Sequence, residues 1–263
     1  MALDLEALTA FAEHLADIGR EMLIGAEDEA RDVAVKADRS FVTDLDRRIE
    51  QKLRHEITSR FPGHGLIGEE EGRERSDAPI QWVLDPIDGT APFIAGVPVY
   101  ATLVAMAVEG VPVIGVADFP PARRRFVGVS GRPTLQNGRR CDTRAAPLEG
   151  AMLACMNPDF FAAEERLALD SLRSATAWRI YGTSSLAYGL LAAGRIDLCF
   201  DTRLQIYDFA SYRPIIEGAG GCVTDWAGAA LTLDSGPRIL AAGSHALHDT
   251  ALALVQGKAV ANS

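Results

Sequence analysis

The chain has 263 residues, of which 48% are hydrophobic and 24% are charged, and this composition is that of an ordinary globular protein and not of a fibrous or disordered one. Its 26 lysines and arginines stand against 36 aspartates and glutamates, which gives a formal net charge of −10. A broad binding surface for nucleic acid is therefore not expected, whereas cations are attracted.

Membrane segments and thiol-based sites are not indicated either. No apolar run is long enough to span a bilayer, and the N-terminus lacks the basic and apolar segments of a leader, so we expect a cytoplasmic protein. The four cysteines form no C-x-x-C pair, so we expect buried free thiols and neither a zinc site nor a disulfide framework.

Two amphipathic helices are predicted at the start of the chain. From Leu5 to Ile24 the apolar residues recur at three- and four-residue spacing, as one face of a helix requires. A second helix is predicted from near Thr43 to just before Phe61, and Asp46 then lies in its first turn. The first helix is interpreted as scaffold.

The middle of the chain is predicted to form a sheet. The apolar segment Ile80–Leu84 reads as a buried strand that delivers Asp85 at its C-terminal end. Three further strands, separated by turn residues and followed by an Asn-Gly turn, indicate an antiparallel region. These strands are predicted at Val99–Ala107, Val111–Asp118 and Arg125–Val129.

The second half mixes helix and strand, and no repeat or linker separates it from the first. We predict strands at Met152–Met156 and Ile196–Phe200, helices at Phe160–Ser174 and Ser184–Ala193, and a C-terminal surface helix in which His245 and His248 are solvated. The chain is interpreted as one unit, 1–263, with approximate subdomains 1–140 and 141–263 and a ligand cleft between them.

The segment from Asp85 to Thr90, Asp-Pro-Ile-Asp-Gly-Thr, is the strongest candidate for chemistry. Two carboxylates so close together repel each other unless a cation lies between them. Gly89 permits close approach of a ligand, and Thr90 begins a helical turn whose N–H groups favour an anion. The alternative is structural: Asp85 and Asp88 could form only an Asx-turn and a helix cap.

Two other acidic segments accompany it. Gly68-Glu69-Glu70 lies in a predicted loop, and Tyr207-Asp208 is followed by the run Glu217-Gly-Ala-Gly-Gly221. A solvated charge run and a helix N-cap are the plain alternatives for these acids.

The three segments, in this order, resemble those of the inositol monophosphatase-like phosphatases, and the likeness extends over about residues 36 to 246. The resemblance implies a mixed α/β fold, an αβαβα layered sandwich. It also implies a phosphoric monoester hydrolase with two or three Mg²⁺ ions, or Mn²⁺, and inhibition by Li⁺. The implied metal ligands are Glu69, Asp85, the backbone carbonyl of Ile87, Asp88 and Asp208.

The resemblance also assigns roles around the metals. One metal activates a water as nucleophile, and another stabilises the leaving oxygen and the phosphate charge. Thr90 orients that water and is held by Asp46. Glu70 supports the metal ligands without binding the metal itself. The N–H groups of Gly89 and Thr90 receive phosphate oxygens.

Within the family, the flanking sequence is most similar to histidinol-phosphate phosphatases. It departs from them where the substrate is selected: Gly182-Thr183-Ser184 replaces G-G-D, Asp201 replaces a glutamate, and Gln205 replaces a basic residue. Thr183, Ser184 and Asp201 are the candidate substrate contacts. The resemblance also implies a homodimer acting on a small phosphorylated metabolite, with no membrane or nucleic-acid partner.

Two alternatives stay open at this point. The first is an inositol-1-phosphate or broad sugar-phosphate phosphatase that uses the same metals. The second is a non-catalytic relative that binds a phosphorylated metabolite or acts as a regulatory module.

Overall fold

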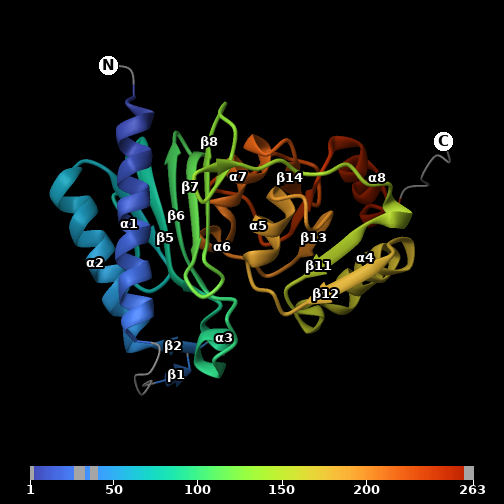
Figure 1. Cartoon of the computed structure of the whole chain (residues 1–263), viewed down its shortest axis with the longest axis horizontal. Coiled ribbons are helices and arrows are strands. Elements are labelled where there is room, and N and C mark those ends of the chain that lie inside the picture. The colour runs from blue at the N-terminus through green and yellow to red at the C-terminus, as the bar shows by residue number, and fades with distance from the viewer. Residues whose placement is uncertain (1–2, 27–32, 36–40, 258–263) are drawn as a thin grey trace.

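The protein folds as five alternating layers of helix and sheet, as the computed structural model in Figure 1 shows. The structure describes residues 3–26, 33–35 and 41–257, and Lys36, where the family resemblance begins, lies outside them. Two helices, α1 (Leu5–Gly25) and α2 (Asp44–Arg60), cover the outer face of the larger sheet. This arrangement confirms the predicted αβαβα sandwich.

The larger sheet has the strand order β10-β9-β8-β7-β6-β5-β3-β4, in which only β3 and β5 are parallel neighbours. Its strands are β3 (Gly65–Gly68), β4 (Gly72–Glu74), β5 (Ile80–Asp88), β6 (Ala101–Val108), β7 (Val111–Phe119), β8 (Arg124–Val129), β9 (Leu135–Gln136) and β10 (Arg139–Arg140). A separate hairpin joins β1 (Val33–Val35) to β2 (Phe41–Thr43), and the short helix α3 (Thr90–Ala95) follows β5.

The smaller sheet has the order β12-β11-β13-β15-β14. Its strands are β11 (Met152–Cys155), β12 (Trp178–Tyr181), β13 (Leu198–Asp201), β14 (Cys222–Asp225) and β15 (Ile239–Ala242). The helices of this half are α4 (Ala163–Ala175), α5 (Leu186–Ala192), α6 (Ile206–Phe209), α7 (Tyr212–Gly218) and α8 (His245–Val255), with 3₁₀ turns η1 (Leu148–Gly150) and η2 (Pro158–Phe160).

Helix α7, in the helix layer between the two sheets, packs directly against the larger sheet. Helix α7 packs on β7 and β8, where a Cβ on Gly115 or Gly128 would collide with the backbone of Ser211 or Ile215. Glycine is therefore needed at both strand positions for the helix to approach this closely. The division into subdomains 1–140 and 141–263 stays a prediction.

The two N-terminal helices form as predicted, and each has a local reason. Helix α1 buries Leu8, Phe11 and Leu15 on one face, which follows the helical period. Helix α2 begins with a capping box, in which the Thr43 hydroxyl and the Asp46 carboxylate bond to each other's backbone N–H groups.

Some predictions were wrong or incomplete. Strand β5 does not end at Leu84 but continues to Asp88, paired with β6. Strands β12, β14 and β15 were not predicted. His248 was expected to be solvated but is buried, with its Nε2 2.8 Å from the Thr224 hydroxyl, because α8 packs against α4 and β15; His245 is exposed as expected.

The remaining expectations have separate outcomes. Cys155 and Cys199 are buried free thiols, whereas Cys141 and Cys222 are free but half-buried. No helix in the described ranges is both long and apolar enough to cross a membrane. The cytoplasmic location stays a prediction.

Candidate active site

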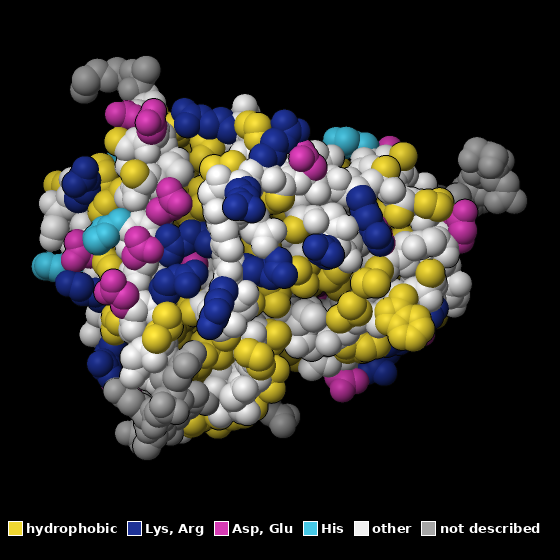
Figure 2. All heavy atoms as spheres, in the orientation of Figure 1, with side chains coloured by type: hydrophobic (Ala, Val, Ile, Leu, Met, Phe, Trp, Pro, Cys, Tyr) yellow, Lys and Arg dark blue, Asp and Glu magenta, His cyan; other side chains and the backbone are white. Residues whose placement is uncertain are grey.

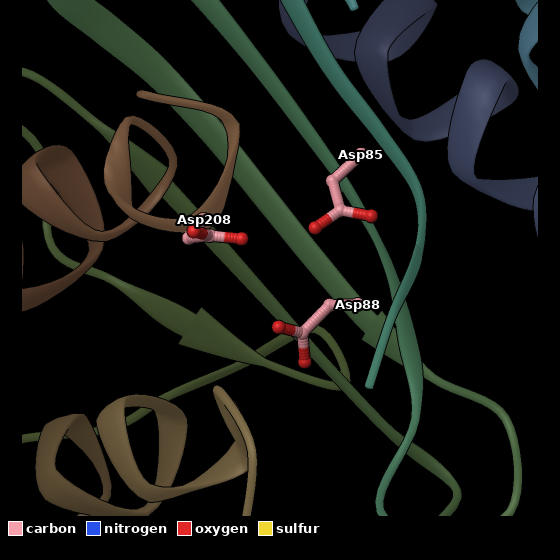
Figure 3. Close-up of side chains that lie close together, drawn as sticks. All are labelled: Asp85, Asp88 and Asp208. Carbon is pink, nitrogen blue, oxygen red and sulfur yellow. The ribbon is translucent and has the colours of Figure 1, made fainter. Parts of the chain in front are cut away.

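Three aspartates converge where β5 faces the start of α6. Oxygens of Asp85, Asp88 and Asp208 all lie within 4.8 Å of one another, and Figure 3 shows the three side chains pointing toward a common centre. Asp85 and Asp88 are buried, and Asp208 is half-buried. Asp85 and Asp88 are three positions apart in the sequence, and the fold brings Asp208, 120 positions further along the chain, to the same place.

An irregularity in β5 allows two of these side chains to share one side of the sheet. In a regular strand, residues three apart point to opposite faces. The pairing with β6 shifts register between Asp85, opposite Leu103, and Asp88, opposite Ala101. Such a bulge redirects a side chain, which is why both carboxylates can reach the same point.

The cluster carries unfavourable charge. Burial, and then repulsion from Glu69, Asp88 and Asp208, raises the pKa of Asp85 well above its ordinary value. Burial also raises the pKa of Asp88 to about 6 and that of Asp208 well above its usual range. The protein has gathered acids at a place where their anionic forms are disfavoured.

A divalent cation fits this arrangement. Within the described residues, Oδ1 of Asp85 is buried and has no hydrogen-bond partner. An unpaired buried carboxylate oxygen is costly, and a hard cation such as Mg²⁺ is bound by carboxylate and carbonyl oxygens. Both the donor set and the orphaned oxygen are therefore what a cation site requires.

The loop that carries Glu69 and Glu70 is held from behind by a buried residue that sequence reasoning missed. Glu50, on α2, accepts hydrogen bonds from the N–H groups of Glu70 at 2.7 Å and Glu71 at 3.0 Å. Glu50 is itself paired with Arg54 at 2.8 Å. Glu69 is outside the group of three aspartates, but its charge is near enough to raise the pKa of Asp85.

The predicted link between Asp46 and Thr90 is present in the structure. The Thr90 hydroxyl lies 3.3 Å from Oδ1 of Asp46 and 3.0 Å from the carbonyl oxygen of Ile87. Burial raises the pKa of Asp46, although bonds from Thr43 and Thr90 oppose this effect. Gly89 precedes α3 in the left-handed conformation, at φ 77°.

The candidate substrate residues occupy two different environments. Ser184, at φ 46°, lies beside Gly89, where an added Cβ would come within 2.7 Å of the serine hydroxyl. The Thr183 hydroxyl is buried and has no partner within the described residues. Asp201 is 2% exposed on β13, and its two oxygens accept from the Met156 N–H at 2.6 Å and the Tyr188 hydroxyl at 3.0 Å.

Sequence reasoning also missed Ser185. Its hydroxyl and its backbone N–H both donate to Oδ2 of Asp88, at 2.5 and 3.2 Å. The two residues are 97 positions apart, so no local pattern could have indicated the contact.

The layered sandwich and its buried acidic centre are those of a metal-dependent phosphatase. The inositol monophosphatase family model matches residues 4–259, and the chain belongs to this family. It is 36% identical to the bifunctional phosphatase IMPL2, chloroplastic, of Arabidopsis thaliana, over 95% of this chain and 75% of that one.

Two further relatives extend the comparison. The chain is 33% identical to a histidinol-phosphatase of Mycobacterium tuberculosis, over 86% of this chain and 89% of that one. Among solved structures, an inositol monophosphatase from Zymomonas mobilis superimposes with a TM-score of 0.88 at 37% identity, over 97% of this chain and 100% of that one.

Proposed function

We propose that the protein hydrolyses a small phosphate monoester with Mg²⁺, and that histidinol phosphate is its first candidate substrate. The convergence of Asp85, Asp88 and Asp208 around a buried, unpartnered carboxylate oxygen is the observation that carries the proposal. The histidinol-phosphatase relative supports the choice of substrate.

Glu69, Asp85, the carbonyl of Ile87, Asp88 and Asp208 are the groups that would hold the cations. When bound, Mg²⁺ supplies Lewis-acid stabilisation of phosphate charge and lowers the pKa of a water that serves as nucleophile. Mn²⁺ has similar ligand preferences and is expected to substitute.

The chain's own residues orient the reacting groups. The Thr90 hydroxyl, fixed between Asp46 and the Ile87 carbonyl, is placed to align the attacking water. The N–H groups of Gly89 and Thr90, at the start of α3, are assigned to the phosphate oxygens. Glu70 lies in the loop whose backbone donates hydrogen bonds to Glu50, and it supports the metal ligands without binding the metal itself.

Substrate selection is assigned to the segment beside Gly89. Thr183 offers a buried hydroxyl with no partner in the described part of the chain, and Ser184 lies against Gly89, one of the two residues assigned to the phosphate oxygens. Because both oxygens of Asp201 are engaged inside the protein, that residue acts on a cationic substrate through its charge and not through a direct hydrogen bond. Histidinol phosphate carries an ammonium group that such a charge would favour.

The alternative substrate is inositol 1-phosphate or a sugar phosphate. The likeness to the Zymomonas mobilis inositol monophosphatase and the loss of the G-G-D segment at Gly182-Thr183-Ser184 both favour it. A non-catalytic module ranks lower, because the three aspartates and the Asp46–Thr90 pair are assembled.

Phosphate release from a panel of esters separates these alternatives. Histidinol phosphate, inositol 1-phosphate and a sugar phosphate are assayed with Mg²⁺, with Mn²⁺, with Mg²⁺ plus Li⁺, and with EDTA. We expect release that needs the metal, falls with Li⁺ and prefers histidinol phosphate. Equal turnover of all esters would reject the dedicated role, and release unaffected by EDTA would reject the metal mechanism.

We also propose that the protein is a homodimer. Strand β12 is an end strand of the smaller sheet, and Figure 2 shows hydrophobic side chains gathered over the region of β12 and α4. Of the residues on these two elements, Trp178 on β12 is 65% exposed and Leu167 on α4 is 73% exposed. Contiguous exposed apolar surface is typical of an interface. Light scattering tests the mass, and Trp178→Glu is expected to give monomers.

A further inference from the structure

Asp88 belongs to the first half of the chain, but the hydrogen bonds that orient its carboxylate come from the second half. We infer that Ser185 is a positioning residue that fixes Asp88 for cation binding. This inference rests on the proposed metal-dependent function and adds a residue that its family motifs do not contain.

The contact is specific to one oxygen. Both donors of Ser185, the hydroxyl and the backbone N–H, bond to Oδ2 of Asp88. Two donors on a single oxygen fix the plane of the carboxylate and leave Oδ1 for a cation, since each carboxylate oxygen can take more than one partner. Ser185 is completely buried, so water does not compete for this bond.

The backbone around Ser185 is shaped to bring it there. Gly182 at φ 74° and Ser184 at φ 46° both adopt the left-handed conformation between β12 and α5. A non-glycine residue in this conformation is uncommon and persists only where its surroundings hold it. Ser184 at the same time lies against Gly89, which is assigned to phosphate binding. The two adjacent serines thus contact Gly89 and the proposed metal ligand Asp88, respectively.

The affinity for cations distinguishes this role of Ser185 from simple stabilisation of the fold. Partners that orient a metal ligand contribute about 10- to 100-fold to metal affinity. A serine that only filled space would affect the stability of the fold and leave cation affinity unchanged. Cation binding without substrate is therefore the informative readout.

The test measures Mn²⁺ binding to the substrate-free protein by electron paramagnetic resonance, for wild type, Ser185→Ala and Thr176→Val. Thr176→Val is the matched control, because it removes another buried hydroxyl, one bonded to the Leu172 carbonyl at 2.8 Å. Mg²⁺ half-saturation and kcat are measured on the same samples, and circular dichroism establishes that each is folded.

We expect Ser185→Ala to weaken Mn²⁺ binding and raise the Mg²⁺ half-saturation concentration by about 10-fold or more, with a smaller change in kcat at saturating Mg²⁺. Thr176→Val should bind Mn²⁺ as wild type does. If Ser185→Ala does not fold, Ser185→Cys, which keeps a weak donor, takes its place and should show a smaller loss of the same sign.

Mn²⁺ affinity unchanged in Ser185→Ala, beside a metal-dependent wild type, would overturn the role of Ser185 and leave the proposed function intact. Equal weakening in Thr176→Val would overturn it too, because the effect would then be general. A wild type that binds no Mn²⁺ would instead overturn the proposed function itself.

Discussion

The Thr90 hydroxyl bonds to Oδ1 of Asp46, while Oδ2 of the same carboxylate accepts the backbone N–H and the hydroxyl of Thr43 at 2.7 and 2.5 Å. One side chain thus caps helix α2 and reaches the turn that follows Asp85 and Asp88, the proposed metal ligands. The start of helix α2, in the outer layer, is in this way linked to the proposed active site at the end of β5.

The two roles of Asp46 can be separated by substitution. Asp46→Ala should lose about 1 kcal/mol of stability with the cap and lower kcat by about 100-fold or more, because Thr90 no longer has its partner. Thr43→Val removes the capping hydroxyl alone, so it should lose similar stability and keep most of its turnover. Urea unfolding and kcat at saturating Mg²⁺ provide the comparison. An equal loss of turnover in both variants would mean that the cap, and not the link to Thr90, matters.

Removing one acid from the cluster should have opposite effects on activity and on stability. Asp85→Asn should lower phosphate release by at least about 1000-fold, since metal stabilisation of charge contributes several kcal/mol. The same change should raise the melting temperature in EDTA at neutral pH. Burial and repulsion raise the pKa of Asp85, and such a group costs stability above its unfolded pKa.

The matched control for this experiment is Asp197→Asn. Asp197 is equally buried but is bonded to Arg144 at 2.6 and 2.7 Å, so its loss should lower the melting temperature, with or without Mg²⁺, by breaking a paired charge. Wild type should gain stability from Mg²⁺, whereas Asp85→Asn should not. Destabilisation of Asp85→Asn in EDTA would contradict the interpretation of the cluster as a site of repulsion.

The sequence predicts elements well where the signal is local. The helical period from Leu5 and the capping residue Thr43 each determine their helix within a few positions, and both helices form there. Strand β12 escaped prediction because it is an end strand with no buried residue: Trp178 and Tyr181 are exposed and the two residues between them are half-buried, so it lacks a buried apolar run. Likewise, the strand was predicted to end at Leu84, but the bulge allows β5 to continue past Pro86 to Asp88.

For the candidate site, sequence reasoning supplied the acids but not their supports. The motifs around Asp85 and Asp208 are recognisable because several residues lie close together in the chain. Glu50 and Ser185 each contact the site by two hydrogen bonds, to residues at least 20 and 97 positions away along the chain. Such contacts depend on tertiary packing, which no pattern in a short window reports.

The support of the acidic loop by Glu50 leads to a further prediction. Glu50→Gln should loosen the backbone of Glu70 and Glu71, because an amide cannot accept all three of the bonds that the carboxylate accepts. We expect the Mg²⁺ concentration for half-maximal activity to rise by about 10-fold, with a smaller change in kcat. A magnesium titration of activity measures this.

Glu74→Gln is the control for that variant. Glu74 bonds to the same Arg54 at 2.9 Å, but its side chain is 47% exposed and its other ion pair is with Arg75 at 3.8 Å. Surface pairs of this kind contribute little, so the Mg²⁺ dependence should stay that of wild type. A similar shift in both variants would indicate that Arg54, and not the loop contacts of Glu50, is responsible.

The last prediction concerns Asp201 and pH. Burial raises the pKa of this carboxyl from 3.8 to about 6, even though the Met156 N–H and the Tyr188 hydroxyl donate to it. Between these two pH values the folded protein binds more protons than the unfolded chain, so this group's contribution to stability is lost as pH rises. A shift of about two units corresponds to a loss on the order of 3 kcal/mol. The free energy of unfolding, measured with urea in EDTA from pH 4 to 7, should therefore fall more steeply for wild type than for Asp201→Asn. The asparagine amide does not titrate; its oxygen can accept from the Met156 N–H and its NH2 group can donate to the Tyr188 oxygen. Parallel pH profiles of unfolding free energy for the two proteins would show that Asp201 is ionised in the folded protein throughout this range. In that case, kcat/KM of Asp201→Asn for histidinol phosphate would decide whether the charge of Asp201 selects the substrate.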